Sequence, residues 1–300
     1  MSPVRIGMRY VLPLLASGSA ALGVGISTLW FLTPLGLALL LYYLWYVSER
    51  WWAAAWAGLL FGFATSGAGI WWFWDTPPLG WLAITSPLVE WYAVGVIWST
   101  VALSMGLAVA LGALLLWYIR NNRFVLLATP LVWMVVEEAR MLFFSLFTIG
   151  ENSLVGPHFS VAALGYPLTE SGHLLQFASL GGVMALNGVV ALGAGALAIY
   201  ARGRYRVPSI VLGLLLIVPF FLSLPVVNDS PLRVAVIGDT IDASTVRNWD
   251  RTYAVLEEVA AQPPFPDVIV LPEGHGITPD TEAAITSLFT NHEVLILNSR

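Results

Sequence analysis

Residues 267–274 read DVIVLPEG, and this stretch decides how the C-terminal part of the chain folds. A short apolar run that ends in Pro and Gly predicts a buried β-strand. Because Pro272 cannot donate a hydrogen bond to a neighbouring strand, the strand should end there. Glu273 would then lie at the carboxyl end of a strand, where α/β sheets place their functional side chains. Glu273 is therefore the first candidate catalytic residue.

Two more strands and two helices are predicted around this stretch. A strand at 233–239 precedes a helix at 245–261, and a helix at 279–289 precedes a strand at 293–297. The order strand, helix, strand, helix, strand is typical of a parallel α/β sheet. Parallel sheets are buried on both faces, and residues 228–300 are too few to cover three such strands well. We therefore expect a C-terminally truncated, incomplete α/β domain at residues 228–300.

The remainder of the chain has the composition of an integral membrane protein. Of the 300 residues, 58% are hydrophobic and only 10% are charged, whereas soluble domains are about a quarter charged. Seven apolar runs are each near the length needed to cross a bilayer. They lie at residues 10–29, 31–47, 52–74, 88–118, 124–147, 174–200 and 208–227. We expect a multi-pass α-helical membrane domain at residues 1–227.

The arginines predict the orientation of this domain. All 13 basic residues are Arg, and the loops at 75–87 and 148–173 contain none. The loop arginines lie before the first apolar run or after an even-numbered one: Arg5, Arg9, Arg50, Arg120, Arg123, Arg202, Arg204 and Arg206. Basic loops favour the cytoplasmic side. We therefore expect a cytoplasmic N-terminus, seven spans of the cytoplasmic (inner) membrane and an extracytoplasmic domain from residue 228.

Several kinds of chemistry are excluded for these residues. The chain has no Cys, which rules out disulfides, Cys metal sites and a thiol nucleophile within it. No metal-ligand spacing, Gly-rich phosphate loop or Ser/His/Asp constellation stands out, so no metal or cofactor is expected. A net charge of −5 gives no case for nucleic-acid binding.

The fifth apolar run carries charges in its interior, at Glu137, Glu138 and Arg140. Glu137 and Arg140 are three residues apart, so they share a helix face and can pair. Left unpaired, such a charge would cost at least ~2.5–3.5 kcal/mol. Two interpretations stay open: a buried pair that joins helices, or a pair that holds the polar part of a lipid. His158 and His173 are isolated and are interpreted as interfacial hydrogen-bonding residues.

Five short motifs, taken in order along the chain, resemble those of one membrane family. They are GLLFGF at 58–63 with SGAGIWW at 66–72, PLVW at 130–133 with Glu137 and Arg140, QFASLGG at 176–182, NWD at 248–250 and LPE at 271–273. Together with the seven-helix pattern, they resemble the apolipoprotein N-acyltransferases. These are membrane members of the nitrilase (carbon-nitrogen hydrolase) superfamily, and the resemblance covers essentially the whole chain.

The resemblance implies a nitrilase-like αββα fold after the membrane domain and a Glu-Lys-Cys triad. Such an enzyme moves an acyl chain from a phospholipid donor to the N-terminal amine of a lipoprotein acceptor. Glu273 matches the general base, and Trp249 matches the Trp of the family's Lys-Trp-Asp motif. We assign Trp249, Glu137 and Arg140 lipid-binding or structural roles. The sequence departs from the family at Asn248 and at residues 274–275, which leaves the substrate open.

The chain contains no Lys and no Cys, so two triad members have no candidate and the chain should be inactive alone. The leading interpretation is a truncated N-acyltransferase-like enzyme. A second is one half of a split enzyme whose nitrilase domain is completed by another chain. A third is a non-catalytic lipid-binding or scaffold protein of the membrane, and a fourth is a nitrilase-type membrane enzyme with a different acyl acceptor.

Overall fold

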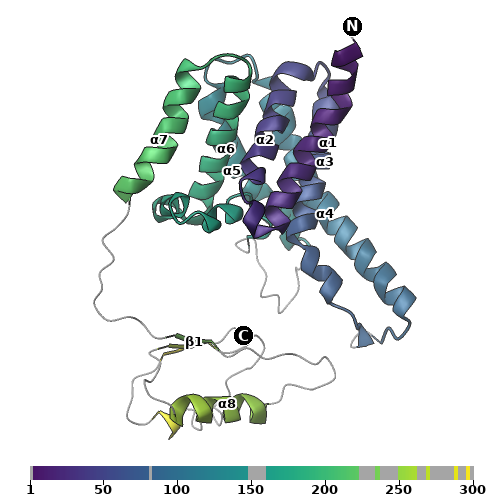
Figure 1. Cartoon of the computed structure of the whole chain (residues 1–300). Helices are drawn as coiled ribbons and strands as arrows, with labels where there is room; N and C mark the ends of the chain where they lie inside the picture. The colour runs from purple at the N-terminus through teal and green to yellow at the C-terminus, as the bar shows by residue number, and fades with distance from the viewer. Residues whose placement is uncertain are drawn as a thin grey trace. The chain divides into compact units, whose positions relative to one another are not determined.

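The computed structural model describes residues 3–80, 83–147, 160–222, 234–236, 249–261, 268–270, 287–289 and 295–297. The chain forms two compact units, Met1–Leu224 and Pro225–Arg300. The first unit is helical, and the second contains a small parallel sheet (Figure 1).

Within its described residues, the first unit contains seven α-helices, which follow the apolar runs of the sequence. They are α1 (Pro3–Gly25), α2 (Leu32–Tyr42), α3 (Trp51–Gly69), α4 (Pro87–Tyr118), α5 (Val125–Ser145), α6 (Gly182–Ala201) and α7 (Arg206–Leu222). A π-helical turn, η2 (Tyr43–Val47), extends α2. Short 3₁₀ segments lie between the helices: η1 (Ser27–Leu29), η3 (Trp71–Asp75), η5 (Tyr166–Glu170) and η6 (Leu174–Leu180).

The observed helices differ from the predicted runs at several ends. The first helix begins before residue 10, because the polar residues that end an apolar run do not end a helix. The run at 52–74 is α-helical only to Gly69 and continues as η3. The run at 174–200 is divided into η6 and α6, because Gly182 adopts a φ of +59°. That left-handed conformation favours glycine and turns the chain between the two segments.

Two features indicate that the helical unit belongs to a membrane protein. Among the described helices, α4 and α6 are long and apolar enough to cross a membrane, with mean hydropathies of 2.1 and 1.9. In addition, α5 turns Leu127, Leu131 and Val135 outward, with exposed fractions of 62%, 66% and 68%. Such an apolar stripe on an outer surface is typical of membrane contact. The number of spans remains a prediction.

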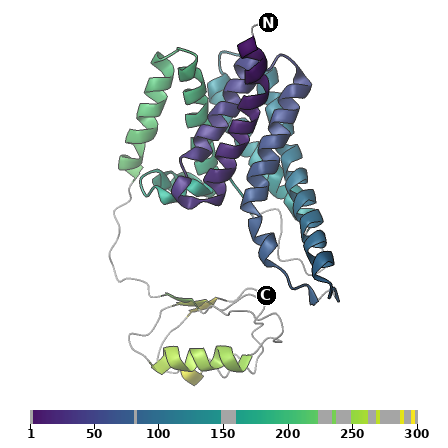
Figure 2. The same ribbon diagram turned by 45° about the vertical axis from the view of Figure 1, so that its right-hand side comes forward.

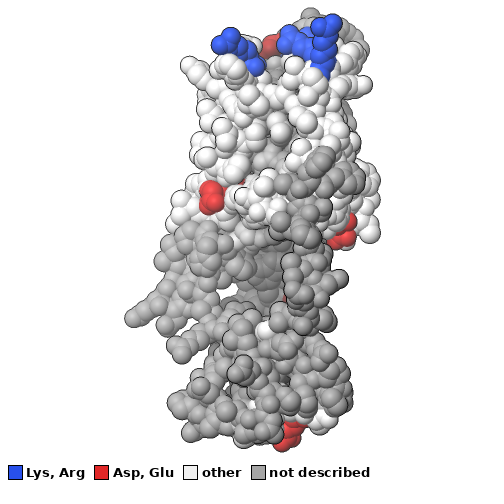
Figure 3. Space-filling view, turned by 90° about the vertical axis from the view of Figure 1, so that its left-hand side faces the viewer, with Lys and Arg blue, Asp and Glu red and all other residues white. Residues whose placement is uncertain are grey.

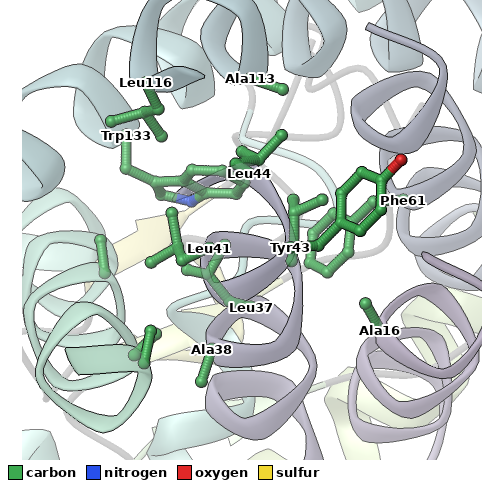
Figure 4. Close-up of a cluster of buried hydrophobic side chains, with 14 of the residues drawn as sticks. Ala16, Leu37, Ala38, Leu41, Tyr43, Leu44, Phe61, Ala113, Leu116 and Trp133 are labelled. Carbon is green, nitrogen blue, oxygen red and sulfur yellow. The ribbon is translucent and has the colours of Figure 1, made fainter. Parts of the chain in front are cut away.

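Close helix packing holds the first unit together. A Cβ atom at Gly62 would lie 2.7 Å from the Cα of Gly106, so α3 and α4 approach at a point where only glycine fits. Small residues serve this purpose between membrane helices. Beside this contact, the rings of Phe61 and Trp133 meet edge to face, with centroids 6.0 Å apart. Figure 4 shows both rings in the core with Leu44 and Leu116.

The N-terminal part of α4 extends past the ends of α5 and α6 (Figures 1 and 2). The segment η3 accompanies it, with the rings of Trp74 and Trp91 stacked at 6.0 Å. Below this stack, the carboxylate of Glu90 accepts a hydrogen bond from the Leu79 backbone N–H at 2.9 Å. The long fourth helix expected from the sequence is thus confirmed, and the aromatic contact braces its end.

The second unit contains three parallel strands in the order β1 (Val234–Val236), β2 (Val268–Val270), β3 (Leu295–Leu297). Helix α8 (Trp249–Ala261) connects β1 to β2. Leu256 of α8 and Ile269 of β2 are fully buried. The parallel pairing predicted from the sequence is confirmed for these strands, which are shorter than the apolar runs around them. Of the helix predicted at 279–289, only residues 287–289 are described.

Candidate functional site

A buried polar network on α5 is the most developed arrangement of charged groups in the helical unit. Arg140 donates from Nη1 to Glu137 Oε2 at 2.7 Å, which is the pairing that the spacing predicts. Trp133 donates from Nε1 to Glu137 Oε1 at 3.0 Å. The second terminal nitrogen of Arg140 donates to the Ser66 hydroxyl on α3 at 3.0 Å. The side chains of Arg140 and Glu137 are only 1% and 2% exposed.

Residues 162–165, which follow α5 in the chain, also contact this network. The backbone of Leu164 hydrogen-bonds the Glu137 carboxylate. The next residue, Gly165, donates its N–H to Asn187 Oδ1 on α6 at 2.6 Å. Nearby, Ala162 packs directly against Gly69 at the end of α3. The buried carboxylate and amide therefore fix this segment among α3, α5 and α6.

The geometry favours the structural interpretation of the Glu137–Arg140 pair. Both carboxylate oxygens of Glu137 are engaged, and the group is removed from solvent. Buried charges persist only when they are paired and hydrogen-bonded. Among the described buried groups, Arg140 Nε has no hydrogen-bond partner, so one donor stays open. By contrast, Glu138 is exposed on the outer face of α5.

An aromatic cluster lies where η3 meets α4. The ring of Trp98 contacts those of Trp71 and Trp74, and its indole N–H donates to the Gly67 carbonyl at 3.0 Å. Outward from the cluster, a shallow groove runs along α4 past Trp91 to Thr100. Tryptophans near helix ends are typical of an aromatic belt at the membrane interface. The adjacent groove would also suit a lipid-facing entrance.

The structure describes some of the remaining predicted residues and not others. Glu273, the predicted general base, lies outside the described residues, as does His158. Trp249 is the first residue of α8. His173 contacts the Leu216 carbonyl of α7 through Nε2 at 2.6 Å, so it is a hydrogen-bonding residue, and its place at a membrane interface stays a prediction. No group of three or more His, Asp or Glu side chains that could hold a metal occurs in the described residues.

Sequence reasoning missed three partners in the network: Ser66, the Leu164 backbone and Asn187. Ser66 is the first residue of the SGAGIWW motif, but nothing local connects it to a residue on α5. Asn187 offered a signal, because a lone amide in an apolar helix needs a buried partner. The backbone of Leu164 offered none.

Comparison with protein families shows which family the chain belongs to. The family model for the apolipoprotein N-acyltransferase N-terminal domain matches residues 16–196. The matched span contains α2 to α5, the C-terminal part of α1, most of α6, and every residue of the buried network. No curated protein matches the chain.

Proposed function

Because the chain belongs to the apolipoprotein N-acyltransferase family, we propose that its helical unit is the membrane domain of an enzyme that acylates lipoproteins. The acyl chain would come from a phospholipid, and the acceptor would be the N-terminal amine of a lipoprotein. The observation that carries this proposal is the family match over the residues that build the Glu137 network.

The proposed topology has seven spans of the cytoplasmic membrane, with the N-terminus in the cytoplasm and the second unit outside. Its support is the separation of arginine-bearing turns from arginine-free loops. Because the chain has no Cys, single-cysteine variants give an unambiguous test. In intact cells, an impermeant thiol reagent should label Thr76→Cys and spare Asn121→Cys, both at exposed positions. The reverse pattern would invert the topology.

The proposed chemistry divides acyl transfer into two steps. A thiolate attacks the phospholipid ester and releases a lysophospholipid, and the lipoprotein amine then attacks the thioester and frees the thiol. Glu273 is proposed as the base that takes the thiol proton, at the edge of a nitrilase-like domain. The thiol and the lysine that would support the oxyanion are not among these 300 residues.

The test uses the native gene product in its own membranes, with a diacylated lipopeptide as the acceptor. Acyl transfer should be measurable as a gain in lipopeptide mass. Glu273→Gln should lower its rate by about 10²–10⁴-fold, because general-base catalysis contributes that much. Glu257→Gln, at an exposed position on α8, is the matched control and should keep the activity.

Two results would contradict the proposal. Folded native protein that transfers no acyl chain to any aminated lipopeptide would refute the function. Full activity of Glu273→Gln would leave the function standing and remove Glu273 from the mechanism. A purified chain of these 300 residues should transfer nothing, because it has no thiol to carry the acyl group.

A further inference from the structure

A cavity of about 940 Å³ lies at the end of the helical unit where the turns α4–α5 and α6–α7 meet. Five arginines line it: Arg120, Arg123, Arg202, Arg204 and Arg206. Figure 3 shows arginine side chains gathered at this end. No Asp or Glu is among its described lining residues. The cavity therefore concentrates positive charge without a carboxylate to neutralise it.

The two turns that carry these arginines have defined conformations. In the α6–α7 turn, Gly203 has a φ of +83°, and its N–H donates to the Tyr200 carbonyl at 2.9 Å. In the α4–α5 turn, the Asn122 side chain accepts the Phe124 N–H at 2.9 Å. Both are tight turns of a kind that fixes chain direction. The arginines therefore project from anchored backbone around one cavity.

Aromatic residues hold two of the guanidinium groups and supply a further donor. Arg120 lies 4.0 Å over the ring of Trp117 and donates to its carbonyl at 2.8 Å. Arg202 lies 5.3 Å from the ring of Tyr46. The indole of Trp45 lines the same cavity and is only 7% exposed. Its N–H has no hydrogen-bond partner in the described part of the chain.

A general excess of arginine in cytoplasmic loops does not account for this arrangement. A second cavity at this end of the unit, between α1 and α3, is lined by Arg9, Glu49 and Arg50. There, Arg9 pairs with Glu49 at 2.5 Å. The described ion pairs of the chain are this one and Glu137–Arg140, and neither uses an arginine of the larger cavity. The five arginines of the larger cavity are therefore free to pair with an anion from outside the chain.

We propose that the arginine-lined cavity binds the phosphate-bearing headgroup of an anionic phospholipid. Arginine forks match phosphate oxygens, and basic pockets between membrane helices at the cytoplasmic side are suited to anionic headgroups. Of its apolar lining residues, Val207 is exposed at the start of α7, where an acyl chain would lie. This site is distinct from the proposed acyl-transfer chemistry, which would occur on the other side of the membrane.

The experiment measures lipid retention by the native protein in detergent, using native mass spectrometry. Phosphatidylglycerol, cardiolipin and phosphatidylcholine are titrated separately, and inorganic phosphate is added as a competitor. The two anionic lipids should bind more tightly than phosphatidylcholine. Arg204→Gln should weaken their binding about five-fold, the effect expected for one basic residue near an anionic headgroup. Arg123→Gln combined with Arg204→Gln should weaken it about 25-fold.

Arg50→Gln is the matched control, because it removes the same charge at the same end without touching this cavity. It should leave retention of the anionic lipids unchanged. An equal loss in Arg50→Gln and Arg204→Gln would show general charge attraction and overturn the proposal. Equal retention of phosphatidylcholine would also overturn it. Displacement of the lipid by millimolar phosphate would assign the cavity to a free anion instead.

Discussion

Replacing Glu137 by Gln tests whether the buried network holds the helices together. The change keeps the size of the side chain and an oxygen for Trp133, but it removes the only carboxylate paired with Arg140 among the described residues. At an effective dielectric constant of about 20, charges 2.7 Å apart attract by roughly 6 kcal/mol. Much of that attraction offsets the desolvation of the two ions, which amounts to several kcal/mol each.

The net expectation is a loss of about 3–5 kcal/mol in the free energy of unfolding, because the guanidinium of Arg140 stays buried without its counter-ion. The measurement is unfolding of the native protein in mixed micelles as the SDS fraction rises. Glu138→Gln is the matched control: it makes the same chemical change one residue away, at an exposed position. Because this change leaves no buried ion without its partner, it should not lower the stability.

The double variant Glu137→Gln with Arg140→Gln distinguishes pairing from simple loss of side chains. It leaves no unpaired charge, so its loss of stability should be smaller than the sum of the two single losses, and the difference measures the coupling. If Glu137→Gln and Glu138→Gln are equally stable, the Glu137–Arg140 pair does not stabilise the fold. If the double variant equals the sum, the two charges do not interact, whatever their distance.

Two further changes test the packing around this network by the same unfolding measurement. Gly62→Leu should lower the free energy of unfolding by about 3 kcal/mol, because the new Cβ would meet the Gly106 backbone and overpack the contact. Gly18→Leu is the control and should be tolerated, because a Cβ there would contact nothing within 4 Å. Equal effects of the two changes would contradict the close approach of α3 and α4. Asn187→Ala should lower the free energy of unfolding by about 1–3 kcal/mol, because the buried N–H of Gly165 loses its acceptor, and an unchanged midpoint would mean that this anchor does not stabilise the fold.

The sequence predicted most of the helical unit, because long apolar runs are a strong signal. The pairing of Glu137 with Arg140 was also predictable, since an i, i+3 spacing places both on one face. The contact of Arg140 with Ser66 was not, because it joins residues 74 positions apart and depends on how α3 crosses α5. Local spacing holds no information about that crossing.

Other features of the fold could not be predicted from the sequence, for different physical reasons. The break at Gly182 depends on a backbone angle, and hydropathy does not record backbone angles. The glycines of α3 were noted only as part of a family motif, and the structure identifies Gly106 of α4 as the residue that Gly62 approaches. The catalytic assignment of Glu273 remains a prediction, because it rests on a short strand-end motif and on the family resemblance.

The length of α4 has a consequence for how the protein responds to its bilayer. Its 32 residues span about 48 Å, whereas the hydrocarbon core is about 30 Å thick. Fitting the whole helix inside by tilt would need an angle of roughly 50°, beyond the usual range of 0–40°. A spanning α4 would therefore extend beyond the hydrocarbon core, and the Trp74–Trp91 stack braces its N-terminal turns. The thickness of the bilayer would then set how much of this helix lies outside the hydrocarbon.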